Sequence, residues 1–565
     1  MRPDAVIVQD LAMAHLVRQT GFKGEVHWST LANVSFPSAL RLIQEKLPID
    51  SLVLPRELTV DEVKNVAAAC PPGLNLEVFI HGALCYGVSG RCYWSSFLGG
   101  KSGLRGRCVQ PCRRVYTQGR EACRFFSCLD LSLDVLVKVL MGIPPIRTWK
   151  IEGRKKGPHY VYYVVSGYRL LRDHGGDPQA KRDALHFLSR ALGRPGTHYH
   201  FLPQRRQNPV SVGEQTGSGL FIGRTHAAGR RAFFSPREEL LPGDLLRIGY
   251  EDTPGHRIER MGRAVPKGGR YALPSAAGGV PKGTAVFLID RREQALEDLI
   301  KGLEAELPAA PPSPPPSSEF MAKLPSPARG LLKPAELQGF RQPPRLPLPR
   351  RIGHWLSLAA LAGTPDGFHR TVWWWLPPAL FPDDEAAIRD LIQAARGRGS
   401  RTFVLNDPWQ IALFPPGGGE VRFWAGPFCN LANPLALETA AALGFSGAVV
   451  TPELASPDFL KLPSRSPLPL GAVVGGNWPL CVARTMADGL ELETPLRSPK
   501  GEEAWAVQHG SLYWVFPNWE LDLREQTEAL RRAGYCLFVR LVEPVPATVR
   551  RKDRPGLWNW SGELL

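Results

Sequence analysis

The chain has 565 residues, and a hydrophobic content of 44% is enough to bury several cores. No apolar run approaches the roughly 20 residues that a membrane helix needs, which excludes a membrane-spanning protein. The net charge of +16 comes mainly from arginine, whose planar fork pairs with phosphate, and favours a polyanionic partner such as RNA. A GC-rich genome that encodes arginine in place of lysine would give the same excess.

The N-terminus predicts a protein that stays in the cytoplasm. Asp4 and Asp10 interrupt any apolar core of an export signal in the first sixteen residues. Thiols in that compartment stay reduced, so the ten cysteines are expected to be free or to bind metal.

Residues 1–200 alternate between strand and helix patterns, as expected for a parallel (β/α) TIM-barrel-like module or for a doubly wound sheet. The expected helices after the last strand span residues 157–174 and 178–192. The expected strands are residues 6–10, 25–29, 51–55, 76–82 and 148–153, and the expected intervening helices are 36–47, 59–70 and 132–142.

Three further regions follow this module. Residues 201–300 contain short strands with glycine turns and predict a small antiparallel β-barrel. Residues 301–350 are rich in proline and predict an extended linker that could reach for a protein partner. Residues 351–565 predict a second α/β module.

The second module repeats the first. A shift of 396 positions places Trp28 on Trp424, Glu57 on Glu453 and Cys85 on Cys481 without a gap. The second copy has a strand and a helix upstream, at 370–378 and 383–399, that have no counterpart after Met1. The first barrel is therefore expected to lack about three strands, through a miscalled start or because another chain completes the sheet.

Four cysteines, Cys85, Cys92, Cys108 and Cys112, lie in one glycine- and arginine-rich segment. Thiolates are soft ligands, so this group predicts a zinc ion or an iron-sulfur cluster. The irregular spacing leaves the two open, because zinc ribbons usually pair their cysteines two residues apart. Other cysteines in apolar or helical surroundings are expected to be structural: Cys70, Cys429 and Cys536.

Polar residues follow the expected strands at their C-terminal ends, where parallel barrels form their active sites. Glu57, His81 and Glu152 are the candidate proton-transfer groups, and Arg154 is a candidate cation. Asp10, Ser29 and Arg56 follow strands in the same way.

The cysteine segment is also basic and aromatic, a mixture suited to phosphate contacts and to stacking on unpaired bases. Core packing would explain the aromatic residues equally well. The predicted RNA-binding residues are Arg91, Arg105, Arg107, Arg113 and Arg114. No HExxH or GxSxG motif is present, and the GGKSG segment lacks the first glycine of a phosphate-binding loop.

Residues 77–116 resemble the signature of the collagenase-like peptidase family U32, and residues 149–169 resemble its second hallmark. The resemblance covers about residues 5–175, with a looser echo in 401–481. It implies a 4Fe-4S cluster on Cys85, Cys92 and Cys108. It leaves Cys112, Cys123 or Cys128 for the fourth position, because Ser132 follows Asp130 and Leu131 where the family often has cysteine.

The resemblance implies two functions, and the apparent truncation of the first barrel adds a third hypothesis. The first is an oxygen-independent hydroxylase of tRNA or rRNA bases that uses the cluster and takes oxygen from prephenate. The second is the proteolysis for which the family is named. The third is a non-catalytic module that binds RNA or protein and keeps a structural cluster.

Overall fold

The structure is a computed structural model. It describes residues 3–154, 156–199, 201–202, 207–210, 212, 219–226, 232–250, 255–273, 280–291, 293–308, 320–328, 333–341, 351–415, 421–552 and 560. The proline runs within 309–319 and 342–350, on which the expected protein partner depended, lie outside these residues.

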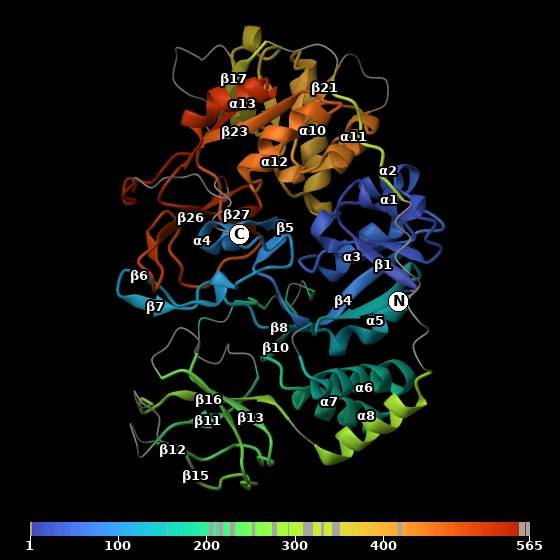
Figure 1. Ribbon diagram of the computed structural model, residues 1–565, viewed down its shortest axis with the longest axis vertical. Helices are drawn as coiled ribbons and strands as arrows, with labels where there is room; N and C mark the ends of the chain where they lie inside the picture. Colours follow the sequence, from blue (N-terminus) through green and yellow to red (C-terminus); the bar gives the residue numbers. More distant parts are fainter. Residues whose placement is uncertain are drawn as a thin grey trace.

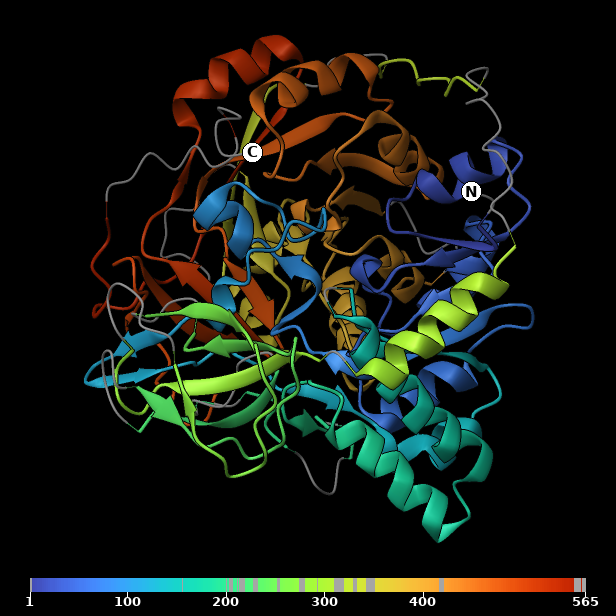
Figure 2. The same ribbon diagram turned by 60° about the horizontal axis from the view of Figure 1, so that its bottom comes forward.

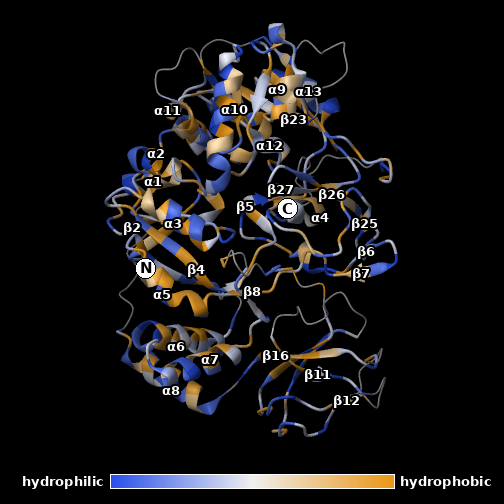
Figure 3. Cartoon of the chain, turned by 180° about the vertical axis from the view of Figure 1, so that it is seen from behind, coloured by the Kyte–Doolittle hydropathy of each residue, from blue (hydrophilic) through white to orange (hydrophobic). Residues whose placement is uncertain are grey.

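The first module is an open sheet with five parallel strands. These are β1 (Ala5–Val8), β2 (Glu25–Trp28), β3 (Ser51–Val53), β4 (Asn75–Ala83) and β9 (Ile146–Ile151). Two short strands extend the sheet beyond β4: β8 (Asp130–Ser132) runs antiparallel to it, and β10 (Gly196–Thr197) pairs with β8. All five strands expected in residues 1–200 are present. β4 is buried along nearly its whole length, and Figure 3 shows its hydrophobic residues in orange among hydrophilic ones in blue.

The expected helices of the first module are present, and α1 is an additional helix that the sequence pattern does not predict. α3 begins with a capping box, in which Thr59 and Glu62 satisfy each other's backbone N–H groups. The others are α1 (Met13–Gln19), α2 (Ala39–Lys46), α5 (Val137–Met141), α6 (Pro158–His174) and α7 (Pro178–Ser189), and α3 spans Val60–Ala68.

The second module is a closed barrel of eight parallel strands, at the top of Figure 1. The ring closes because β22 pairs with β23, β23 with β29 and β29 with β17. Its strands are β17 (Ala335–Phe340), β18 (Ile352–Trp355), β19 (Trp373–Trp375), β20 (Thr402–Leu405), β21 (Arg422–Ala425), β22 (Phe445–Val449), β23 (Leu470–Gly476) and β29 (Leu537–Val542). Its helices are α9 (Leu358–Gly363), α10 (Glu385–Gly397), α11 (Pro434–Ala442), α12 (Ser456–Lys461) and α13 (Thr527–Ala533).

The expected linker boundary is therefore wrong. β17 lies inside residues 301–350, and Leu337 within it is fully buried. Proline composition concealed this strand, which is short and flanked on both sides by proline-rich sequence.

The shift of 396 positions that aligns the two sequences also places β1–β4 on β20–β23. The barrel strands that precede β20, namely β17, β18 and β19, have no counterpart among the described strands of the first module. The open sheet and the closed barrel differ by these three strands.

The two modules share an antiparallel sheet that the sequence does not predict. Its order is β5 (Gly87–Cys92), β24 (Cys481–Ala483), β27 (Leu512–Pro517), β26 (Glu503–His509), β25 (Leu496–Arg497), β6 (Tyr116–Gln118) and β7 (Glu121–Cys123). β5, β6 and β7 come from the cysteine segment and its continuation, and the other strands from the second module. One hydrophobic core runs through both modules.

Residues 220–290 have a separate hydrophobic core. The described strands form a four-stranded and a two-stranded antiparallel sheet, and the closed barrel stays a prediction. The strands are β11 (Leu220–Arg224), β12 (Phe233–Phe234), β13 (Leu245–Ile248), β14 (Arg257–Arg260), β15 (Tyr271–Ala272) and β16 (Ala285–Asp290). α8 (Gln294–Glu306) follows and lies beside α6 and α7 (Figures 1 and 2). Among the described residues, every helix is too short or too polar to cross a membrane.

Candidate functional site

The cysteine segment begins where β4 ends and leads directly into the shared sheet. Cys85 follows Ala83, and Cys92 is the last residue of β5. The short helix α4 (Trp94–Gly99) and a loop then bring the chain to Cys108, and Cys112 lies in a single 3-10 turn at Pro111–Arg113. The Ser95 hydroxyl donates to Cys108 Sγ at 3.5 Å, and the Gln110 N–H donates to the same sulfur at 3.3 Å.

The thiols of this segment lie close enough to influence one another electrostatically. Burial raises the pKa of Cys112 to about 12, and Cys85 and Cys108 contribute to the shift. The pKa of Cys92 lies well above its usual value, mainly because of burial; Cys481 and Cys85 raise it further. Such thiols stay protonated at neutral pH unless a bound cation stabilises the thiolates.

Cys85 and Cys128 border the same region. Cys85 is exposed at the edge of this region. The protein atoms packed around the Cys85 thiol nevertheless raise its pKa. Cys128 is buried, and burial raises its pKa to about 12, with Cys85 as a neighbouring thiol.

Among the described residues, no three His, Cys, Asp or Glu side chains are arranged so that they could hold a metal ion. The thiols are nevertheless soft donors gathered in one region, which is the chemistry that an iron-sulfur cluster requires. Each iron of a cluster takes its own thiolate, so its ligands stand farther apart than those of a single zinc ion. Soft thiol donors suit either an iron-sulfur cluster or zinc, so the metal and its ligands both stay predictions.

Two of the five arginines expected to bind RNA have internal partners instead. Arg91 is only 2% exposed and donates to the carbonyls of Pro378 and Asn406. Arg113 donates to the carbonyl of Leu84 at 3.0 Å and to that of Cys128, so it fixes the backbone beside two cysteines. The RNA contact of Arg91 stays a prediction, and its buried guanidinium joins the two modules.

The other predicted cations remain at the surface. Arg105 and Arg107 are exposed on the loop between Cys92 and Cys108. Arg114 is partly exposed and lies 3.9 Å from Glu502. Arg154 is exposed and donates to the Gly106 carbonyl at 3.5 Å, which places it against the same loop.

Glu57 lies beside the cysteines. Its carboxylate accepts hydrogen bonds from the Ser89 N–H at 2.7 Å and from the Ser89 hydroxyl at 3.2 Å. Burial raises its pKa, against the opposing effect of those hydrogen bonds and of Arg56. Glu57 also lines a small cavity together with Arg56, Cys85 and Cys128.

The other two candidate proton-transfer groups differ in position. His81 is buried against Tyr160 and Tyr168, and the Tyr168 hydroxyl lies 3.4 Å from its Nδ1. Burial lowers the pKa of His81 to about 4, so it is neutral and held within the core. Glu152 lies next to the loop that carries Arg154, with its N–H bonded to the His81 carbonyl at 2.9 Å.

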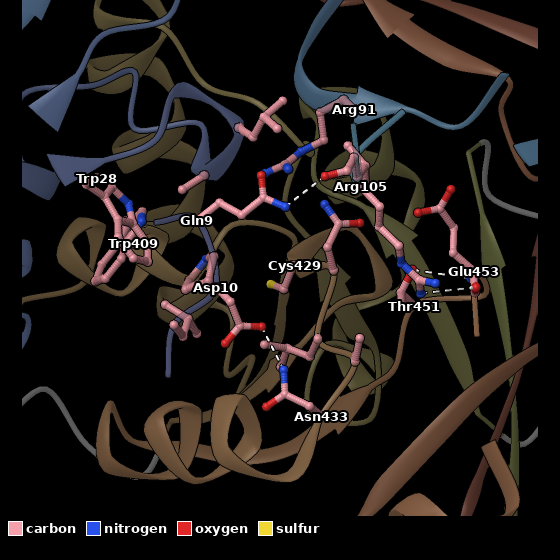
Figure 4. Close-up of a pocket in the computed structure, with 18 residues that line it drawn as sticks. Gln9, Asp10, Trp28, Arg91, Arg105, Trp409, Cys429, Asn433, Thr451 and Glu453 are labelled. Atoms are coloured by element: carbon pink, nitrogen blue, oxygen red, sulfur yellow. Dashed lines mark hydrogen bonds between the residues drawn. The ribbon is translucent and has the colours of Figure 1, made fainter. Parts of the chain in front are cut away.

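A cavity of about 300 Å³ lies between the two modules (Figure 4). It is formed where β1 and β2 end in the first module and where β20, β21 and β22 end in the second. This is the strand edge on which the sequence predicted an active site. The cysteine segment contributes Arg91, Leu104 and Arg105 to its wall.

Acidic, amide and cationic groups line this cavity. Asp10 accepts a hydrogen bond from Asn433 Nδ2 at 2.7 Å, and burial raises its pKa. On the other side, Glu453 accepts hydrogen bonds from Ser96 and from Ser102, and burial raises its pKa as well. These carboxyl groups have the environment of groups that hold or transfer a proton.

Sequence reasoning missed the contribution of the second module. Cys481, Asn433, Glu453 and Arg484 all face groups of the first module. The repeat contained the relevant signal, because it pairs Glu453 with Glu57 and Cys481 with Cys85. Asp488 and Ala504 stand where Cys92 and Cys108 would map, so the repeat by itself indicates no second cysteine cluster.

Residues 1–210 match the sequence model of peptidase family U32, which confirms the resemblance for that part of the chain. A collagenase of Porphyromonas gingivalis is 37% identical over 183 residues, 29% of this chain and 43% of the relative. The tRNA hydroxylation protein P1 of Bacillus subtilis is 33% identical over 187 residues, 31% of this chain and 44% of the relative.

A 23S rRNA 5-hydroxycytidine C2501 synthase of Escherichia coli is 33% identical over 177 residues, 30% of this chain and 26% of the relative. The chain thus spans less than half the length of these curated relatives. The solved structure of the U32 peptidase Mk0906 covers 41% of this chain and all of its own, with 12% identity and a TM-score of 0.26, too low to bear on the fold.

Proposed function

Starting from the match of residues 1–210 to peptidase family U32, we propose that this chain is an iron-sulfur hydroxylase of tRNA or rRNA bases that works without O₂. The observation that carries the proposal is the position of the cysteine segment, which gathers several thiols near one another and contributes Arg91 and Arg105 to the wall of the inter-module cavity. Relatives named for tRNA and rRNA hydroxylation support this choice of substrate.

Cys85, Cys92 and Cys108 would hold the cluster, with Cys112 or Cys128 in the fourth position. When bound, a 4Fe-4S cluster supplies electron-transfer chemistry and orders the loops that carry its ligands. Arg113 contributes by fixing the carbonyls of Leu84 and Cys128 beside these ligands.

RNA would approach over the loop between Cys92 and Cys108. Arg105 and Arg107 are exposed there, and Arg154 contacts the same loop. Enzymes that modify a base take it out of the stack into a pocket, and a cavity of about 300 Å³ is large enough for one unpaired base. An RNA substrate agrees with the cytoplasmic location that the sequence predicts.

The reaction replaces a C–H bond of the base with C–O–H, a two-electron oxidation that adds one oxygen atom. An organic acid such as prephenate would supply the hydroxyl group as its own C–OH bond breaks, and its carbon would take up the two electrons together with the proton that the base loses, forming a C–H bond. Arg105 at the cavity wall can pair with its carboxylates. Glu57 and Glu152 lie where a proton could be held beside the cysteine segment, and the buried His81 would position β4 rather than contact the substrate.

The collagenase relative favours a second candidate, a peptidase. A thiol protease needs a cysteine with a lowered pKa. Within the described cavity wall the single cysteine is Cys429, whose pKa is raised by burial and whose thiol donates to the Leu405 carbonyl. The site therefore supports hydroxylation better than thiol proteolysis.

Mass spectrometry of digested tRNA and rRNA from a strain that lacks this gene tests the proposal. One nucleoside should lose a single oxygen atom, and the wild-type gene should restore it whereas a Cys85→Ser gene should not. Unchanged RNA would contradict the hydroxylase and leave a binding module. Cleavage of casein by both the purified wild-type protein and the purified Cys85→Ser variant would favour the peptidase.

A further inference from the structure

The second module contributes a cysteine to the proposed centre. Cys481 and Cys92 are direct partners in the antiparallel pairing of β24 with β5. Directly opposed residues in such a pair project their side chains to the same face of the sheet, with Cβ atoms about 4.5–5.5 Å apart. The Tyr93 N–H donates to the Leu480 carbonyl at 2.8 Å, which fixes the neighbouring residues of both strands.

The space beside the two cysteines is kept open by a glycine. A Cβ on Gly87 would lie 3.0 Å from Cβ of Cys92 and 3.7 Å from Cβ of Cys481. The Cβ atoms of Cys92 and Cys481 therefore both lie next to Gly87 of β5. Cys481 is fully buried, so its thiol has no access to bulk water.

Cys481 also belongs to the electrostatic group of thiols. Burial has the largest effect on the pKa of Cys92, and Cys481 is the neighbouring group that raises it most. The pKa of Cys481 is itself raised well above its usual value by burial, then by Cys112 and Cys85. The sequence repeat adds an independent observation, since Cys481 occupies the position of Cys85 in the second copy.

We infer that Cys481 takes the fourth ligand position of the cluster, beside Cys85, Cys92 and one thiolate of the Cys108–Cys112 pair. This rests on the proposed function for the existence of the cluster and replaces Cys112 or Cys128 as the separate fourth ligand. A centre held in this way joins the first module to the closed barrel, so it also stabilises their interface.

Anaerobic reconstitution of the full-length chain tests this inference. The variants are Cys481→Ala and Cys128→Ala, with Cys536→Ala as a control for loss of a buried thiol elsewhere in the second module. Iron and acid-labile sulfide per chain should fall at least twofold in Cys481→Ala and stay at the wild-type level in the other two. Cluster removal should lower the thermal unfolding midpoint of the wild type and leave that of Cys481→Ala unchanged.

Wild-type iron and an unchanged electron paramagnetic resonance spectrum in Cys481→Ala would overturn the inference, as would loss of iron in Cys128→Ala alone. Wild-type protein without iron would overturn both the inference and the cluster of the proposed function. If the cluster depends on Cys481 but the RNA of the deletion strain is unchanged, the inference stands and only the hydroxylase proposal is contradicted.

A measurement on the wild-type chain covers the case in which Cys481→Ala does not fold. Diamide can take up two protons and two electrons from a pair of opposed cysteines, leaving a disulfide. Peptide mapping should find a Cys92–Cys481 disulfide in cluster-free protein and at least tenfold less in reconstituted protein. Equal amounts in both states would overturn the inference, because ligated thiolates are protected from this oxidation.

Discussion

Arg91 and Asp407 form an ion pair across the interface of the two modules, with an N to O distance of 3.4 Å and side chains that are 3% and 2% exposed. Burial raises the pKa of Asp407 to about 6 even though Arg91 opposes the shift. This pair explains why an arginine of the cysteine segment is absent from the surface.

Arg91→Met should leave Asp407 buried without its cation. Removing one partner of a buried pair costs about 3–5 kcal/mol in the free energy of unfolding. The double variant Arg91→Met with Asp407→Asn should recover most of that loss, because no charge remains buried. Urea unfolding of the three proteins measures this, and a loss below about 1 kcal/mol in Arg91→Met would contradict the account.

Arg484 forms a second connection between the modules. It donates to both carboxylate oxygens of Glu62, at 2.7 Å and 2.5 Å, and to the Glu57 carbonyl at 2.6 Å. Arg484→Gln should therefore lower the free energy of unfolding by about 3 kcal/mol or more. Arg497 pairs with Glu503 at 2.6 Å but is 66% exposed, so Arg497→Gln should cost less than about 1 kcal/mol. Equal losses in urea unfolding would refute a special role for Arg484.

Local patterns predicted most of the strands of the first module and the helices between them. Alternating hydrophobic segments identified β1–β4 and β9 because each is short, apolar and followed by polar residues. β17 was missed because its two flanks are dominated by proline, whereas the strand itself joins a ring through pairing with β29, about 200 residues away in the chain.

The candidate site was predicted in part. The cysteine spacing directed attention to a segment that contributes to the cavity wall, but the sheet formed by β5 and β24 depends on pairing between distant segments that no local pattern specifies. For the same reason, the exposure of Arg91 could not be predicted: its partners, Pro378, Asn406 and Asp407, belong to the other module.

The buried His81 gives the fold a defined dependence on pH. Burial lowers its pKa to about 4, whereas an unfolded histidine titrates near pH 6.5. The unfolded chain therefore binds a proton between pH 6.5 and 4 that the folded chain does not, and stability falls as the pH is lowered through that window. The loss attributable to this group is about 1.4 kcal/mol per pH unit, or about 3 kcal/mol in all.

Urea unfolding between pH 7 and pH 4 checks this contribution. His81→Gln should lose less stability on acidification than the wild type. His186→Gln, on the exposed face of α7, should retain the wild-type slope of unfolding free energy against pH. A wild-type slope in His81→Gln would exclude this histidine as the source.

Arg105 and Arg107 should account for part of the RNA affinity, because both are exposed on the loop beside the cavity. Each phosphate contact contributes about 0.7 to the slope of log affinity against log salt for a single strand. Arg105→Gln combined with Arg107→Gln should lower that slope by about 1.4 and weaken binding at low salt. Arg182→Gln on α7 serves as the control, and equal slopes in both proteins would place the RNA elsewhere.

The central claim is that thiol-held iron supports hydroxylation of RNA without O₂. Its most direct test is nucleoside mass spectrometry of RNA from the gene-deletion strain, complemented and grown with and without O₂. The account predicts that the wild-type gene restores the oxygenated nucleoside under both conditions, and that Cys92→Ser restores it under neither. Restoration by Cys92→Ser, or a wild-type product that disappears without O₂, would contradict it.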